Sequence, residues 1–177
     1  MTAREELKAA TQAAHDRVDA AFDHDLANPI IYVAFLAAQA SAYLPVEEAL
    51  TACGAARLIE NWHDHRRAPL LAADLATLDC APPDLIAPPE YRGEAAVVGG
   101  LYVLEGSRMG AAVLLRRVLP GLPIAFLSAR AEPGHWTRFI ASLDQLLYSP
   151  QRLDAAIEAA SATFACFEQA AKLVVKR

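Results

Sequence analysis

The stretch EAAVVGGLYVLEGSRMGAAVLLRRVL, residues 94–119, decides the fold class, because it keeps a helical pattern although four of the eight glycines fall within it. These glycines are Gly99, Gly100, Gly106 and Gly110. Each costs about 1 kcal/mol relative to alanine inside a helix, so their clustering requires a compensating reason. Gly99, Gly106 and Gly110 share one face and leave a strip of bare backbone. The strip fits either a closely packed helix or a flat ligand lying at a kink.

The rest of the chain also follows helical periodicity. Further helices are expected over residues 4–23, 30–43, 46–65, 70–78, 133–147 and 150–174. Pro45 is expected to interrupt or restart the second of these. Between Cys80 and Gly93, four prolines predict an ordered surface crossing without helix. Because no period-2 run indicates a strand, we predict an all-α fold, a single compact domain of six to eight helices over residues 1–177.

Composition narrows the class of function. The 177 residues fit one domain, and 55% hydrophobic residues, with 39 alanines, favour a helical core. A net charge of −5 with scattered basic residues disfavours nucleic-acid binding. Three distant cysteines without CxxC spacing suggest neither a disulfide framework nor a structural zinc site, which fits a reducing cytoplasm. The charged N-terminus and the lack of a long uninterrupted apolar run predict a soluble protein without a membrane contact.

The first expected helix contains a second candidate for a ligand contact, LKAATQAAHDRVD at residues 7–19. His15 lies beside the apolar stripe, and Asp19 follows one turn later, where it can orient the imidazole. Lys8 lies two turns earlier, about 10 Å along the axis. An axial histidine with an ammonium at that distance matches the size of a metalloporphyrin with its carboxylates. A polar histidine and a solvated lysine on a helix surface would give the same pattern.

Together these segments resemble a known family. Residues 7–19 resemble the proximal helix of heme oxygenases, in which an L-K-x-x-T-x-x-x-H run ends at the axial histidine. Residues 101–111, LYVLEGSRMGA, are similar to their distal helix, where a glycine-rich kink rests over the heme. The sequence YVLEGS resembles that of the bacterial branch of the family that is often associated with phytochromes. The segments WTRF at 136–139 and TFACFE at 163–168 also resemble bacterial members, whereas residues 45–92 add little.

The resemblance implies a heme oxygenase, which opens heme to biliverdin, carbon monoxide and ferrous iron, with heme as both substrate and cofactor. The site residues that it implies are His15 as the iron ligand, Lys8, Arg138 and Phe164 as heme contacts, Gly106 and Gly110 as heme contacts with a catalytic role, and Ser107 as a catalytic group. The partners that it implies are O2, a reductase or ferredoxin, and a bacteriophytochrome that receives biliverdin. Electrons have to come from a partner, because the sequence contains no nucleotide-binding fingerprint.

Two positions depart from the family pattern. Many members have an aspartate directly after the first distal glycine, where it organises water around bound oxygen, but this chain has Ser107. A serine hydroxyl orders water without supplying a negative charge. Ala111 replaces the second residue of the usual glycine pair and adds a methyl group near the ligand. These departures leave open a non-catalytic heme-binding or heme-sensing protein, and glycines that merely pack helices leave open a helical adaptor without heme.

The other histidines are expected to have no part in the chemistry. His63 and His65 are two residues apart and point to different faces of a helix, so both are expected to be polar surface residues. His24 and His135 lie near helix ends, where a partly exposed imidazole is tolerated. The three cysteines are expected to be small buried apolar residues.

Overall fold

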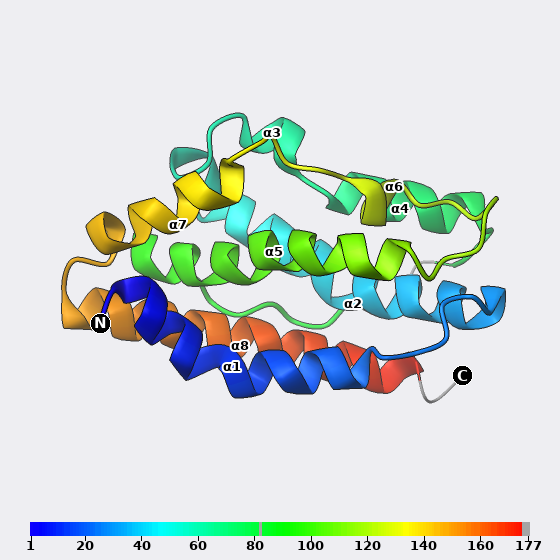
Figure 1. Ribbon diagram of the computed structural model, residues 1–177, viewed down its shortest axis with the longest axis horizontal. Helices are drawn as coiled ribbons and strands as arrows, with labels where there is room; N and C mark the ends of the chain where they lie inside the picture. Colours follow the sequence, from blue (N-terminus) through cyan, green and yellow to red (C-terminus); the bar gives the residue numbers. More distant parts are fainter. Residues whose placement is uncertain (82, 175–177) are drawn as a thin grey trace.

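In the computed structural model, which describes residues 1–81 and 83–174, the chain forms helices joined by loops, with no strand among these residues. The helices are α1 (Ala3–Ala21), α2 (Pro29–Ala52), the 3-10 helix η1 (Ala55–Arg57), α3 (Trp62–His65), α4 (Ala68–Thr77), α5 (Glu94–Leu115), α6 (Ala125–Ser128), α7 (His135–Leu146) and α8 (Pro150–Val174). The all-α prediction is confirmed. Figure 1 shows α5 through the middle of the molecule, with α8 and α1 on one side and α6 and α4 on the other.

The first two helices begin where the sequence provides caps. The Thr2 hydroxyl accepts a hydrogen bond from the Glu5 N–H at 3.2 Å, and the Glu5 carboxylate accepts one from the Thr2 N–H at 2.8 Å. This reciprocal capping box satisfies two backbone donors at the start of α1. The Asn28 side chain caps α2 directly before Pro29, whose missing N–H costs nothing at a first helical position.

The expected break at Pro45 is wrong, because α2 continues through it. Pro45 has no N–H, so the carbonyl of Ser41, four residues earlier, lacks its helical partner. The backbone N–H of Ile86 donates to that carbonyl at 2.8 Å. A tertiary hydrogen bond therefore replaces the missing helical one and attaches the crossing between α4 and α5 to α2.

The single helix expected over 46–65 is also wrong. α2 ends at Ala52, and Gly54 follows with φ of 100°, a left-handed conformation that a helix does not continue. Asn61 has a positive φ of 55° and separates η1 from the short helix α3. Sequence periodicity misses both interruptions, since the apolar spacing continues across them. The consequence for the site is that His65, at the end of α3, reaches the side of α5.

Half of the glycine cluster on α5 is explained by packing. A Cβ built on Gly99 would lie 2.1 Å from the carbonyl oxygen of Ala156 on α8. A Cβ built on Gly100 would lie 2.6 Å from the ring of Tyr91 and 2.7 Å from Leu50. These two glycines let α8, α2 and the crossing approach the α5 backbone directly.

Two helices among the described residues, α2 and α5, are long and apolar enough to cross a membrane by length and composition. The buried share of the apolar window is 56% in α2 and 50% in α5. Both helices pack against α8 and against each other. Their apolar character is therefore accounted for by their central place in the bundle.

Candidate functional site

A cavity of about 510 Å³, here called the central cavity, lies between α1, α5 and α8. Six of the seven predicted site residues line it, namely Lys8, His15, Gly106, Ser107, Gly110 and Phe164. The seventh, Arg138 on α7, is not brought to it. The guanidinium of Arg138 donates to the Pro133 carbonyl at 3.1 Å and lies 3.8 Å from the Glu132 carboxylate.

His15 lies on the α1 wall of the central cavity, with its side chain half exposed. Its Nδ1 lies 3.4 Å from Asp19 Oδ2 and 3.7 Å from Asp16 Oδ1. Its ring meets the Phe164 ring edge to face, with the centroids 5.9 Å apart. Both carboxylates lie on the Nδ1 side of the ring. Nε2 has no hydrogen-bond partner among the described residues and is therefore available as a metal ligand.

The opposite wall is the second half of the α5 glycine cluster. Among the described residues, a Cβ built on Gly110 would meet nothing within 4 Å, and one built on Gly106 would meet only the Trp136 ring, at 3.6 Å. Met109 and Val113 beside them are 60% and 62% exposed and also line the cavity. Large apolar side chains that face an open cavity favour a bound apolar ligand. These two glycines therefore have no packing reason of the kind found at Gly99.

Arg67 contributes a buried positive charge to the central cavity, and sequence reasoning missed it. It is 1% exposed. Its Nη2 donates to the Ser107 hydroxyl and to the Leu104 carbonyl, the latter at 3.1 Å. Its Nε donates to the Tyr43 hydroxyl at 3.0 Å, and the guanidinium lies about 5 Å from the ring centroids of Tyr43 and Phe126. Two aromatic faces thus partly compensate a charge that no carboxylate pairs among the described residues.

Glu47 holds Arg67 in this position. The Glu47 carboxylate, 1% exposed, accepts hydrogen bonds from the backbone N–H groups of Arg67 and Ala68 at 2.8 and 3.0 Å. A carboxylate at the N-terminus of α4 is stabilised by the free N–H groups there. No motif in the sequence marks Arg67, since its partners lie 20 to 40 residues away along the chain.

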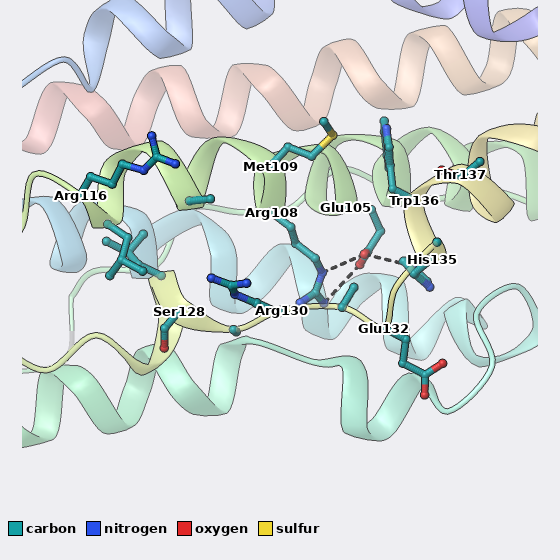
Figure 2. A pocket seen from close by; sticks show the side chains of 16 residues that line it. Glu105, Arg108, Met109, Arg116, Ser128, Arg130, Glu132, His135, Trp136 and Thr137 are labelled. Carbon is teal, nitrogen blue, oxygen red and sulfur yellow. Dashed lines mark hydrogen bonds and ion pairs between the residues drawn. The ribbon is translucent and has the colours of Figure 1, made fainter.

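A second cavity of about 610 Å³, here called the side cavity, lies between α5 and the segment 127–137 and shares a wall with the central cavity at Met109, Leu127 and Trp136. Figure 2 shows the Glu105 carboxylate at its floor, between Arg108 and His135. His65 also contacts this carboxylate, at 3.0 Å, and its side chain is only 12% exposed. The expectation of a surface role for His65 is therefore wrong, whereas His63 is exposed as expected.

Glu105 remains charged in this setting. Burial raises the pKa of its carboxyl, but the contacts with His135 and His65 and the charge of Arg108 hold that pKa below its ordinary value. The Arg108 Nε donates to Glu105 Oε2 at 2.8 Å. The rings of His65 and His135 contact each other with centroids 4.1 Å apart and planes tilted by 43°. Spacing along the chain could not reveal the cluster, because its members come from three separate helices.

The sequence model of the heme oxygenase family matches residues 1–172. The chain belongs to the heme oxygenase family. The chain is 42% identical over 113 residues to a heme oxygenase of Xanthomonas campestris pv. campestris (strain 8004), a match that covers 60% of this chain and 68% of the relative. Its fold matches that of the NO- and CO-bound heme oxygenase of Neisseria meningitidis with a TM-score of 0.80 and 24% identity, over 99% of this chain and 93% of that one.

Membership of the family makes this protein an enzyme of heme degradation, with heme as both its substrate and its cofactor. The central cavity fits such a ligand in three respects. It offers an imidazole nitrogen at His15 that has no hydrogen-bond partner in the described part of the chain, a wall of bare backbone at Gly110, and exposed apolar side chains beside that glycine.

Proposed function

We propose that heme lies in the central cavity between His15 and the Gly106–Gly110 segment, with His15 Nε2 as the iron ligand. The observation that carries the proposal is the meeting of these two segments across one cavity, although they lie on α1 and α5. Asp19 would hold the imidazole by its Nδ1 and fix the direction of Nε2. Phe164, which packs edge to face on His15, would contact the macrocycle.

Lys8 would bind a heme carboxylate at the mouth of the cavity. Its side chain is exposed, lines the central cavity and lies on the same helix as His15. Arg138 would have to leave Pro133 and Glu132 to reach heme, so we assign the carboxylate contact to Lys8. A single exposed ammonium orients a ligand more than it holds it, because water and salt screen the contact.

The reaction that we propose is the opening of heme to biliverdin, carbon monoxide and ferrous iron with O2 and electrons from a partner reductase or ferredoxin. Heme itself supplies the iron at which O2 is activated. The residues of this chain would position the heme and order water beside it. Gly106 and Gly110 leave room above the ligand, and Ser107 presents a hydroxyl beside it.

Arg67 and Ser107 act as a pair in this proposal. The Ser107 hydroxyl donates to the Leu104 carbonyl at 2.6 Å and accepts from Arg67. Its second lone pair remains for a water molecule. Where the family often has an aspartate, this chain thus has a neutral hydroxyl held by a buried cation, which would favour negative charge developing in the cavity.

The phytochrome-associated branch, a bacteriophytochrome that receives biliverdin, and a cytoplasmic location are parts of the proposal that rest on the resemblance of the YVLEGS segment and on the cysteine pattern. They are separable from the heme site. Purification of the protein from its own cells would show whether a bacteriophytochrome co-purifies with it. This measurement tests the proposed partner independently of the heme site.

The test is a titration of the protein with heme, followed by addition of reductant and O2. We expect a Soret band with 1:1 stoichiometry and then the absorption of biliverdin. His15→Ala should lose the histidine-ligated spectrum and the turnover but keep the melting temperature, because the side chain is half exposed. His63→Ala, which changes an exposed histidine away from the cavity, is the matched control. Normal turnover in His15→Ala would refute the assignment.

A further inference from the structure

The floor of the side cavity carries a cluster of metal-ligating side chains that the heme site does not use. His65 ends α3, Glu105 lies on α5 and His135 begins α7. The Nε2 atoms of the two histidines lie 3.0 and 3.2 Å from Glu105 Oε2, and the three ligand atoms all lie within 4.8 Å of one another. None of these three residues is among the described residues that line the central cavity.

Hydrogen bonding alone does not satisfy the cluster. The side chain of Glu105 is 1% exposed, and those of His65 and His135 are 12% and 14% exposed. His135 Nε2 is buried and lies 3.2 Å from Glu105 Oε2, but among the described residues it has no partner in hydrogen-bond geometry. A buried polar atom without a partner is unusual in native proteins and calls for an explanation such as a bound ion. An ion at the centre would give this nitrogen its partner.

We propose that His65, Glu105 and His135 form a binding site for a divalent transition-metal ion such as Co²⁺, Zn²⁺ or Fe²⁺. Two imidazoles and one carboxylate suit these ions, whereas Mg²⁺ and Ca²⁺ prefer oxygen ligands. Ligand atoms about 2.1 Å from one ion lie roughly 3.0–3.4 Å apart, which is close to the observed separations from Oε2. In the bound state each imidazole carries its proton on Nδ1, so that the Nε2 lone pair faces the ion.

Arg108 is the natural competitor of the metal. Its Nε donates to Glu105 Oε2 at 2.8 Å, and its Nη2 donates to the His65 carbonyl. A divalent ion and this guanidinium therefore compete for one carboxylate oxygen. Arg108 lines the side cavity, whose volume of about 610 Å³ provides room for the displaced side chain and for water on the remaining coordination positions. Arg108 consequently sets the affinity of the site.

The experiment is a titration of the full-length, heme-free protein with Co²⁺, followed by the visible absorption of the bound ion, and with Zn²⁺, followed by calorimetry. All variants carry His15→Ala, so that metal bound at His15 and Asp19 is not counted. We expect one ion per chain, at least tenfold weaker binding in His65→Ala and in His135→Ala, and severalfold tighter binding in Arg108→Gln. The matched control is His63→Ala, which should bind as the parent does.

Glutamine variants separate metal binding from folding. His65→Gln keeps an N–H donor toward Glu105, and the side-chain amide in His135→Gln places one at similar reach, but an amide is a poor ligand for these ions. We expect both variants to melt as the parent does without metal and to lose the rise in melting temperature that Zn²⁺ causes in the parent. Absence of binding in the His15→Ala parent, or a full Zn²⁺-induced rise in either glutamine variant, would overturn the proposal.

Discussion

A methyl group on Gly99 would lie 2.1 Å from the carbonyl oxygen of Ala156, whereas one on Gly110, three turns later on the same helix, would meet none of the described residues within 4 Å. The two glycines share a face of α5, but α8 covers one and the central cavity opens at the other. Helix packing therefore explains the glycine at position 99, and an open cavity for a ligand explains the glycine at position 110. The division can be measured, because alanine should have opposite effects at the two positions.

We expect Gly99→Ala to destabilise the heme-free protein by about 1–3 kcal/mol, because backbone cannot yield to the added methyl as a side chain would. Gly110→Ala should leave stability unchanged or raise it by up to about 1 kcal/mol through helix propensity. In exchange, Gly110→Ala should slow biliverdin formation. Thermal unfolding of the heme-free variants measures the change in stability. The yield of biliverdin per folded molecule measures the change in turnover. Equal loss of stability in the two variants would contradict this division.

Lys8→Glu should weaken heme binding or change which biliverdin isomer forms, because a carboxylate would repel the heme carboxylate that Lys8 is proposed to bind. The effect should shrink at high salt, since Lys8 is exposed. Heme affinity at two ionic strengths and chromatography of the product are the measurements. Arg138→Glu is the comparison variant. It should change neither the heme affinity nor the biliverdin isomer, because the Arg138 side chain contacts Pro133 and Glu132.

Ser107→Ala removes one of the acceptors of the Arg67 guanidinium and the hydroxyl that we propose orders water. We expect a loss of stability of about 1 kcal/mol, because Arg67 keeps its bonds to Leu104 and Tyr43. Turnover should fall more than heme affinity does. Ser107→Thr, which retains a hydroxyl, should keep both the stability and the turnover of the parent protein. A Ser107→Ala variant with full turnover would show that Arg67 and water do not act through this hydroxyl.

Alkaline stability should depend on Tyr43. Burial raises the pKa of Tyr43 to about 12, although the charge of Arg67 lowers it in part. The unfolded chain ionises this phenol near pH 10, so stability from this group is complete below pH 10 and declines as pH rises to 12. The expected slope is about 1.4 kcal/mol per pH unit. In Tyr43→Phe, the free energy of unfolding measured with denaturant should decline less steeply between pH 9 and 12 than in the parent protein. An unchanged slope would contradict the assignment to Tyr43.

The sequence predicted those features that depend on neighbours along the chain. Three features follow from local rules, and the structure agrees with them. They are the helix starts expected at residues 30 and 150, the crossing rich in proline, and the shared face of Gly106 and Gly110. The spacing of Lys8 and His15 likewise placed both on one wall of the central cavity. Local periodicity is reliable in these places because each depends on one helix only.

The remaining features depend on contacts between distant segments. The continuation of α2 through Pro45 requires the N–H of Ile86, 41 residues later, and the position of Arg67 requires Glu47 and Ser107. The pattern of its own helix predicts a surface position for His65, because its partner Glu105 lies 40 residues away along the chain. Single-sequence reasoning carries no information on which distant polar groups will meet.

The attachment of Ile86 to the carbonyl left free by Pro45 has a consequence for engineering. Tyr91, a few residues later, is anchored as well, because its hydroxyl lies 2.9 Å from the Thr163 hydroxyl, which itself donates to the Ala159 carbonyl. With both points fixed, an insertion between them would break one anchor, although surface loops usually accept added residues. A fluorescent tag or sensor domain should instead be spliced into the exposed turn at residues 119–121, between α5 and α6, which lines neither cavity.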